Sequence, residues 1–152
     1  MSVRTSSVAG HACAAVVTAL ILTACAGPTH SRGDYEHKVA NTAEALQSSA
    51  QTVLLVADLV EHGRALTPYA ARVVSQAEDD ATSVQQTFDS RQPPDSASDE
   101  LRKRADDVIE KVVSAISDAR IGVRGGDLAG LADAAAQLHG LLPELQRLQG
   151  VA

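Results

Sequence analysis

Residues 39–60 have the sequence VANTAEALQSSAQTVLLVADLV. Apolar residues recur in this stretch at alternating intervals of four and three positions: Val39, Ala43, Leu46, Ala50, Val53, Ala57 and Val60. This spacing places them on one stripe of an α-helix, and it is typical of helices that pack along a shared seam. The stretch therefore predicts a long amphipathic helix, with Asp34 as its N-cap and Gly63 just after its last turn.

Three further segments repeat this spacing. The second follows Thr67 and Pro68, a cap and a proline at the first helical position, and stops at Pro93. The third begins in the serine-rich and acidic stretch 95–100, and Asp127 caps the fourth. The seam positions are Ala70, Val74, Ala77, Ala81, Val84 and Phe88 in the second segment; Leu101, Ala105, Val108, Ile109, Val112, Ile116, Ala119 and Val123 in the third; and Leu128, Leu131, Ala135, Leu138, Leu142 and Leu145 in the fourth.

Four amphipathic segments joined by short turns predict an all-α fold, an antiparallel up-down four-helix bundle over residues 34–150. Alanine alternates with valine or leucine along the predicted seams, and small residues let helix axes approach closely. We therefore expect a narrow, filled core without a sizeable internal pocket lined by these alanines.

The first 24 residues have the three parts of an export signal. Arg4 supplies a positive charge, and residues 12–22 form an uncharged apolar core that is too short to span a bilayer, which needs about 20 residues. At the end of this core stand the four residues Leu22-Thr23-Ala24-Cys25. They resemble the lipobox of bacterial lipoproteins, in which the cysteine is acylated and becomes the mature amino terminus.

The resemblance implies that residues 1–24 are a cleaved signal peptide and that lipid on Cys25 anchors the chain to the bacterial cell membrane, outside the cytoplasm. Residues 25–33 would then be a flexible tether, because they are small, polar and broken by glycine and proline. Cys13 would be removed with the signal, so the mature domain would hold no free thiol. The resemblance covers the signal alone and says nothing about the family of the mature domain.

Charge and motifs exclude several classes of function. The chain has 13 basic and 19 acidic side chains, so it lacks the positive charge that would hold nucleic acid. The histidines after the predicted signal are His30, His37, His62 and His139. None of them is paired at the i, i+4 spacing of a helical metal site, and no Glu-x-x-His motif or nucleophile motif occurs. We expect no metal, no cofactor and no enzymatic activity.

One irregularity indicates a function. Leu55 and Leu59 lie roughly opposite the seam of the first helix, so they are expected to face solvent as a docking surface for a partner; the competing interpretation is that this helix is buried more deeply than its neighbours. The sequence thus predicts a non-enzymatic binding protein of the cell envelope, with another envelope protein as its partner. The alternative is a small-ligand carrier or sensor with a groove near Gly140 and Pro143, where proline is expected to kink or break the fourth helix.

Overall fold

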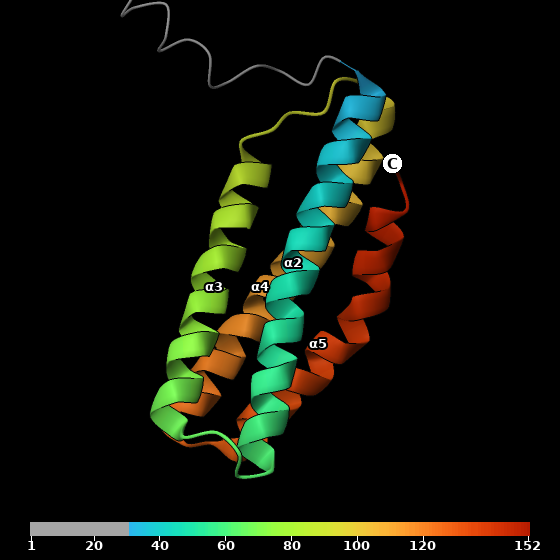
Figure 1. Cartoon of the computed structure of the whole chain (residues 1–152). Coiled ribbons are helices and arrows are strands. Elements are labelled where there is room, and N and C mark those ends of the chain that lie inside the picture. The colour runs from blue at the N-terminus through green and yellow to red at the C-terminus, as the bar shows by residue number, and fades with distance from the viewer. Residues whose placement is uncertain (1–30) are drawn as a thin grey trace, which may run out of the picture.

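The computed structural model describes residues 31–152. This part of the chain forms four helices and no strand: α2 (Arg32–Glu61), α3 (Thr67–Asp89), α4 (Ser96–Gly125) and α5 (Leu128–Gln149). The helices pack around one apolar core (Figure 1). The prediction of an all-α helical bundle is confirmed, whereas the predicted signal peptide and residues 25–30 of the tether lie outside the described residues.

The four helices occupy the corners of a square. Helix α2 contacts α3 on one side, α5 on the other and α4 across the core, while α3 and α5 do not contact each other in the part of the chain that the structure describes. Glu78 of α3 pairs with Arg120 of α4, whereas Phe88 lies against Arg102, so these neighbouring helices run in opposite directions. The α2–α3 turn (62–66) and the α4–α5 turn (126–127) lie together (Figure 1), and we call this end of the bundle the Gly63 end.

The predicted seams form the core. The seam residues are buried except for Val60, Val84, Ala135 and Leu142, which are half-buried against the core, and Leu128. Leu128 was expected to be buried, and this prediction is wrong: 60% of the residue is exposed. It is the first residue of α5, directly after the cap, at the end of the bundle.

Two helix starts differ from the predictions. Helix α2 begins at Arg32, because the Ser31 hydroxyl oxygen accepts a hydrogen bond of 3.1 Å from the backbone N–H of Asp34. Ser31 is therefore the N-cap in place of Asp34, and residues 31–33 of the predicted tether belong to the folded domain. Thr67 is not a cap either, since it is already helical, and the extended residue before it, Leu66, makes no side-chain capping bond.

The α4–α5 turn brings two helices unusually close. Asp127 caps α5 as predicted, accepting a hydrogen bond of 3.0 Å from the N–H of Gly130. Gly122 of α4 is buried at this point, and a Cβ atom on it would lie 2.8 Å from the backbone nitrogen of Leu131. Glycine is therefore required at this crossing. Further along, α5 remains helical through Pro143, and Figure 1 shows a change in the direction of its axis, so the proline bends the helix without breaking it.

An arginine joins α3 to α4 at the other end of the bundle. Arg102 donates hydrogen bonds to the carbonyl oxygens of Asp89, at 3.3 Å, and Arg91, and it pairs with Asp106 at 2.9 Å. The last turn of α3 has no basic residue of its own, so Arg102 satisfies carbonyls that the helix leaves open. Its guanidinium also lies over the ring of Phe88.

Candidate binding surface at the Gly63 end

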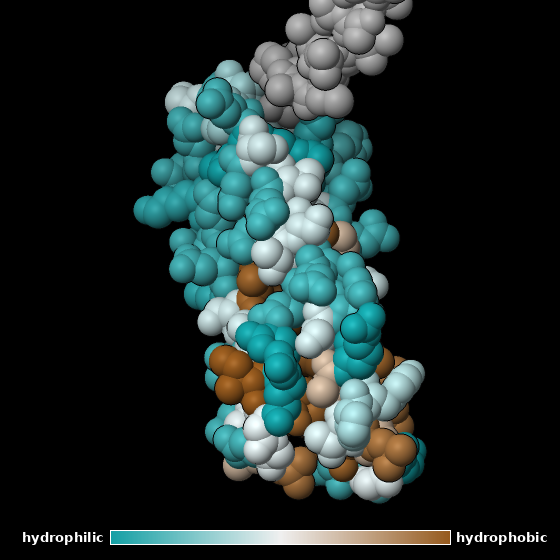
Figure 2. All heavy atoms as spheres, turned by 90° about the vertical axis from the view of Figure 1, so that its left-hand side faces the viewer, coloured by the Kyte–Doolittle hydropathy of each residue, from teal (hydrophilic) through white to brown (hydrophobic). Residues whose placement is uncertain are grey.

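Large apolar side chains are exposed at the Gly63 end. They are Leu55, Leu66, Tyr69, Ile121 and Leu128, and we call these five residues the apolar end surface. They come from all four helices and from the α2–α3 turn. Figure 2 shows hydrophobic residues concentrated toward this end of the visible face, whereas the opposite end is predominantly hydrophilic. Several large exposed apolar residues at one end of a small domain are typical of an interaction surface.

The two leucines of the predicted docking surface differ in exposure. Leu55 is 59% exposed, as expected from its position opposite the seam. Leu59 is only half-exposed, because the α2–α3 turn folds back on it: its carbonyl oxygen accepts hydrogen bonds from the N–H groups of Arg64, at 2.7 Å, and Ala65, at 3.1 Å. Leu55 therefore belongs to the apolar end surface and Leu59 lies at its edge.

Most of the apolar end surface was not anticipated from the sequence. Leu66 lies in a turn, and Tyr69 lies off the predicted seam. Ile121 is also off the seam, two residues after the seam position Ala119 of α4. Each of them looks like an isolated apolar residue in the sequence. All three lie close in sequence to one of the two turns, 62–66 or 126–127. This closeness could have indicated that they lie at the same end of the bundle.

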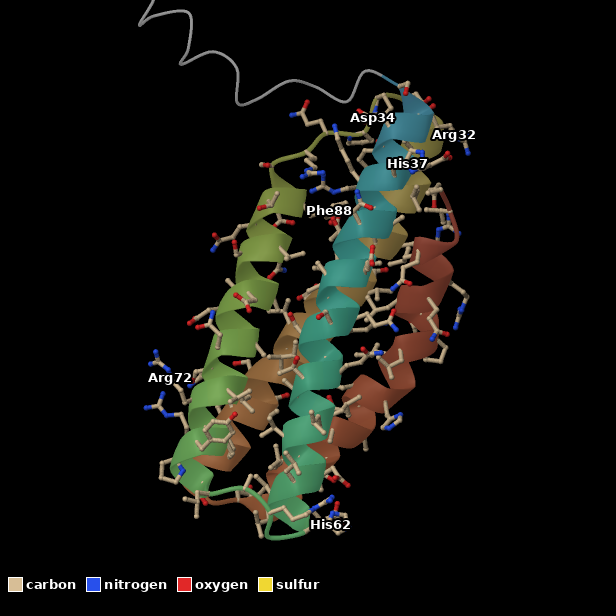
Figure 3. All side chains as sticks on the ribbon, in the orientation of Figure 1. Arg32, Asp34, His37, His62, Arg72 and Phe88 are labelled. Atoms are coloured by element: carbon tan, nitrogen blue, oxygen red, sulfur yellow. The ribbon has the colours of Figure 1, made fainter. Side chains whose placement is uncertain are left out.

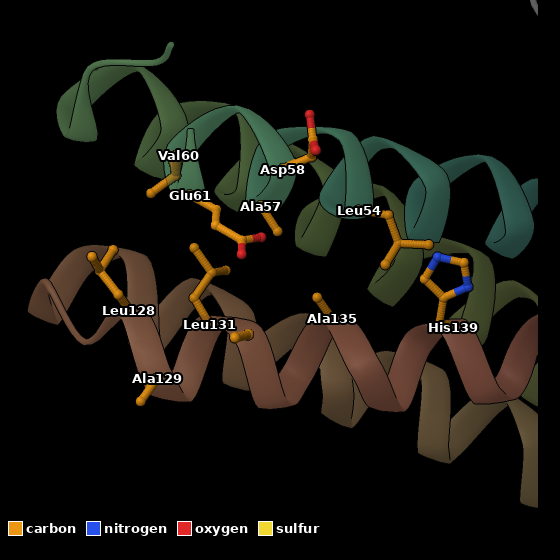
Figure 4. Close-up of a pocket in the computed structure, with 11 residues that line it drawn as sticks. Leu54, Ala57, Asp58, Val60, Glu61, Leu128, Ala129, Leu131, Ala135 and His139 are labelled. Carbon is orange, nitrogen blue, oxygen red and sulfur yellow. The ribbon is translucent and has the colours of Figure 1, made fainter. Parts of the chain in front are cut away.

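A groove opens between α2 and α5 at the same end (Figure 4). Its volume is about 510 Å³, and small residues account for much of its lining, including Ala57 of α2 and Ala132 and Ala135 of α5. We call it the α2–α5 groove. The sequence predicted that no sizeable internal pocket would be lined by seam alanines, whereas this groove lies at the surface, where Ala57 and Ala135 are too small to close the space between the two helices. The groove is open to solvent, so the core itself remains filled.

The charges at the α2–α5 groove are acidic. Asp58 and Glu61 lie on its α2 side, and no lysine or arginine lines it. Asp58 accepts a hydrogen bond of 2.7 Å from Arg64 and lies 3.2 Å from Nδ1 of His62. Glu61 has no ion pair within residues 31–152, and its carboxylate is exposed. The groove therefore offers an apolar surface with an unpaired negative charge at its edge.

The three histidines within residues 31–152 lie apart from one another. His37 lies on the first turns of α2 and His62 at the opposite end of that helix (Figure 3), while His139 lines the α2–α5 groove. Within residues 31–152 no group of three or more histidine, cysteine, aspartate or glutamate side chains is arranged to hold a metal ion. His30 lies outside the described residues.

A second groove lies between α4 and α5. It has a volume of about 490 Å³ and contains Gly140, close to the bend at Pro143 where the alternative function predicted a binding groove. Its polar lining comes from Glu110, Lys111, Ser114, Gln137 and Glu144. These side chains are exposed or half-exposed, so the groove is a shallow surface feature that presents charges of both signs.

Comparison of the chain with protein-family models, with curated proteins and with solved structures gave no match. None of the helices within residues 31–152 is long and apolar enough to cross a membrane. Leu22, Thr23, Ala24 and Cys25, which resemble a lipobox, lie outside the described residues.

Proposed function

We propose that this chain is a lipid-anchored, extracytoplasmic helical bundle of a bacterial cell envelope, which acts by binding another envelope protein and not by catalysis. The observation that carries the binding role is the apolar end surface: Leu55, Leu66, Tyr69, Ile121 and Leu128 are all more than half exposed, and all lie at the Gly63 end. Exposing apolar side chains to water is unfavourable, and a partner that covers them gains about 25 cal/mol for each Å² buried.

The position of the apolar end surface supports this proposal. The proposed anchor, Cys25, precedes the cap Ser31 by a few residues, so the lipid would attach near the start of α2. Helix α2 has 30 residues, which correspond to about 45 Å at 1.5 Å per residue. The bundle would therefore present the Gly63 end well away from the membrane, where a partner can reach it.

The lipid anchor is tested by replacing its cysteine. We expect Cys25→Ser to release the protein from the membrane fraction of cells, and Cys13→Ser, the matched control, to leave it there. Mass spectrometry of the mature amino terminus should find an acylated Cys25. Unmodified peptide that extends upstream of residue 25 would contradict the anchor.

The binding role is tested by purifying the tagged full-length chain after chemical cross-linking in cells. We expect a specific envelope protein to co-purify with the native chain and to be lost from the double variant Leu66→Ser/Ile121→Ser. The control is Glu100→Ser/Lys103→Ser, which changes two exposed residues at the other end of the bundle. Equal recovery from both double variants would argue against the apolar end surface.

The α4–α5 groove favours a second candidate, a small-ligand carrier or sensor. Its lining combines the carboxylates Glu110 and Glu144 with Lys111 and Gln137, a set of polar groups around Leu141 that could orient one small molecule. Native mass spectrometry of the purified chain tests this function. A small molecule retained by the native chain and lost from Lys111→Ala/Gln137→Ala would favour the carrier over the protein-binding role.

A further inference from the structure

The α2–α5 groove contains a carboxylate without a cation beside it. Figure 4 shows Glu61 extending from α2 toward α5, so that its carboxylate lies between the two helices. Asp58 points away from α5 in the same view, and it is already paired with Arg64 at 2.7 Å. Glu61 forms no ion pair within residues 31–152, and no lysine or arginine lines the groove. The negative charge that faces the groove is therefore available to a ligand.

The surroundings of this carboxylate are apolar. The larger part of the lining comes from apolar residues of both helices, among them Leu54, Ala57 and Val60 of α2 and Leu128, Leu131 and Ala135 of α5. A volume of about 510 Å³ is large enough for a small molecule. An apolar lining with one or two well-placed polar groups is typical of small-molecule sites, because burial supplies the affinity and the polar groups fix the orientation.

The groove is elongated along the two helices. It extends along α2 from Leu54 to Glu61, roughly 10 Å, and along α5 from Leu128 to His139, roughly 16 Å. Glu61 lies toward one end of it, and His139 lies at the other end, beside Leu54 (Figure 4). The side chain of Ala135 points into the space between them and leaves it open. This shape fits an extended chain that has its charged group at one end.

We propose that the α2–α5 groove binds a small, elongated apolar molecule with one positive charge, of the alkylammonium class. The ammonium group pairs with the Glu61 carboxylate, and the alkyl chain lies on Ala57 and Ala135 in the direction of His139. An anionic chain of the same length is repelled, because the groove has no cation to offset the charge of Glu61. This site is separate from the α4–α5 groove, and the inference goes beyond the protein-binding role without depending on it.

Titration calorimetry with decylamine, which is an ammonium ion at neutral pH, tests the site. The protein is the full-length chain with Cys25→Ser, because a chain without lipid can be purified without detergent, which would compete for the groove. Below the micelle concentration we expect saturable binding of decylamine, weaker binding of decanol and the weakest binding of decanoate. In ¹H–¹⁵N NMR spectra the signals of Ala57 and Ala135 should shift, whereas that of Ala105, which is buried in α4, should not.

Two substitutions separate the charge from the shape of the groove. We expect Glu61→Gln to weaken the binding of decylamine by about two- to fivefold and to leave that of decanol unchanged, because only the ammonium group loses a partner. Glu44→Gln, at an exposed position of α2 outside the groove, is the control. Ala135→Leu should block both compounds by filling the groove, whereas Ala136→Leu, at the next and exposed position, should not.

Three results would overturn this inference. They are the absence of saturable decylamine binding, equal affinities for decylamine, decanol and decanoate, and an unchanged decylamine affinity in the Glu61→Gln variant. If decylamine does not bind and Ala135→Leu loses the envelope protein in the co-purification experiment, the groove belongs to that protein and not to a small molecule. None of these results alters the recovery of an envelope protein by the native chain, so the proposed binding role is tested separately.

Discussion

The guanidinium carbon of Arg102 lies 4.9 Å from the centroid of the Phe88 ring. The contact joins α4 to the last turn of α3, and the same guanidinium donates to the carbonyl oxygens of Asp89 and Arg91. Phe88 in turn lies 6.4 Å, between ring centroids, from Tyr35 of α2. Arg102, Phe88 and Tyr35 therefore join three helices, α4, α3 and α2, at the end of the bundle where α2 begins.

Removing the Arg102 side chain should destabilise the domain. We expect Arg102→Ala to lower the free energy of unfolding by about 1–3 kcal/mol, because the α3 carbonyls lose their donor and Phe88 loses its cation. Lys103→Ala, one residue away and exposed, should change it by less than about 0.5 kcal/mol. Urea unfolding followed by circular dichroism measures both. Equal effects of the two substitutions would show that the Arg102 contacts contribute little.

Two glycines should respond in opposite directions to alanine. The Cβ of Gly122→Ala would lie 2.8 Å from the backbone nitrogen of Leu131, so we expect a loss of about 1–3 kcal/mol as α4 and α5 are forced apart. Gly140 lies within α5 and has no atom within 4 Å of its Cβ position. Gly140→Ala should therefore stabilise the domain by about 0.5–1 kcal/mol, because alanine loses less conformational entropy in a helix. Thermal unfolding of the two variants tests the pair, and stabilisation by Gly122→Ala would refute the close crossing.

The Tyr35 hydroxyl should contribute little to stability near neutral pH. It is buried, and its one polar interaction is with Arg102 and falls short of normal hydrogen-bond geometry, so Tyr35→Phe should change the free energy of unfolding by less than about 1 kcal/mol. Urea unfolding at pH 7.5 measures the difference. A loss greater than about 1 kcal/mol would mean that the hydroxyl makes a stabilising bond.

The same residue should control the response to alkaline pH. Burial raises the pKa of Tyr35, and the positive charge of Arg102 opposes only part of that shift. The unfolded chain therefore loses this proton first, so stability is full below the ordinary pKa of about 10 and falls as the pH rises above it. We expect Tyr35→Phe to lose less stability than the native chain between pH 9 and pH 11. Parallel losses in the two proteins would exclude Tyr35 as the cause.

The N-cap of α4 should respond to acid. The Ser98 hydroxyl donates to the Asp95 carboxylate at 2.7 Å and the Ser98 backbone N–H at 2.8 Å, and these hydrogen bonds hold the pKa of Asp95 below its ordinary value. The stability that the ionised cap contributes is present above pH 4 and is lost as the pH falls below it. Asp95→Asn, which caps without a charge, should show a weaker dependence on acid than the native chain. Melting temperatures between pH 3 and pH 6 compare them, with Asp107→Asn as an exposed control.

The sequence predicted the core well because seam spacing is a local property. Positions such as Leu46, Val112 and Leu138 follow the alternation of four and three residues, and all are buried. The prediction was wrong for Leu128, whose spacing is correct but which lies at the end of the bundle. Spacing specifies which face of a helix is apolar, whereas burial also depends on whether neighbouring helices extend over that face.

The candidate site was much less predictable. Leu55 was identified because it lies opposite the seam, but Leu66 and Tyr69 reach the same surface through the path of the α2–α3 turn. The α2–α5 groove depends on the separation of two helices that are distant in sequence. The interpretation of Thr67 as a cap was also wrong, because α3 begins at Thr67 and the residue at the cap position is Leu66. Each of these features depends on how segments meet in space.

The most direct test of the central claim, that the Gly63 end binds another envelope protein, is site-specific photo-cross-linking in living cells. A photoreactive phenylalanine analogue is placed at Ile121 in the full-length chain and, as a control, at Lys103 near the opposite end. We predict that Ile121 yields a discrete cross-linked product containing an envelope protein and that Lys103 does not. The same product from both positions, or no product from Ile121, would contradict the account.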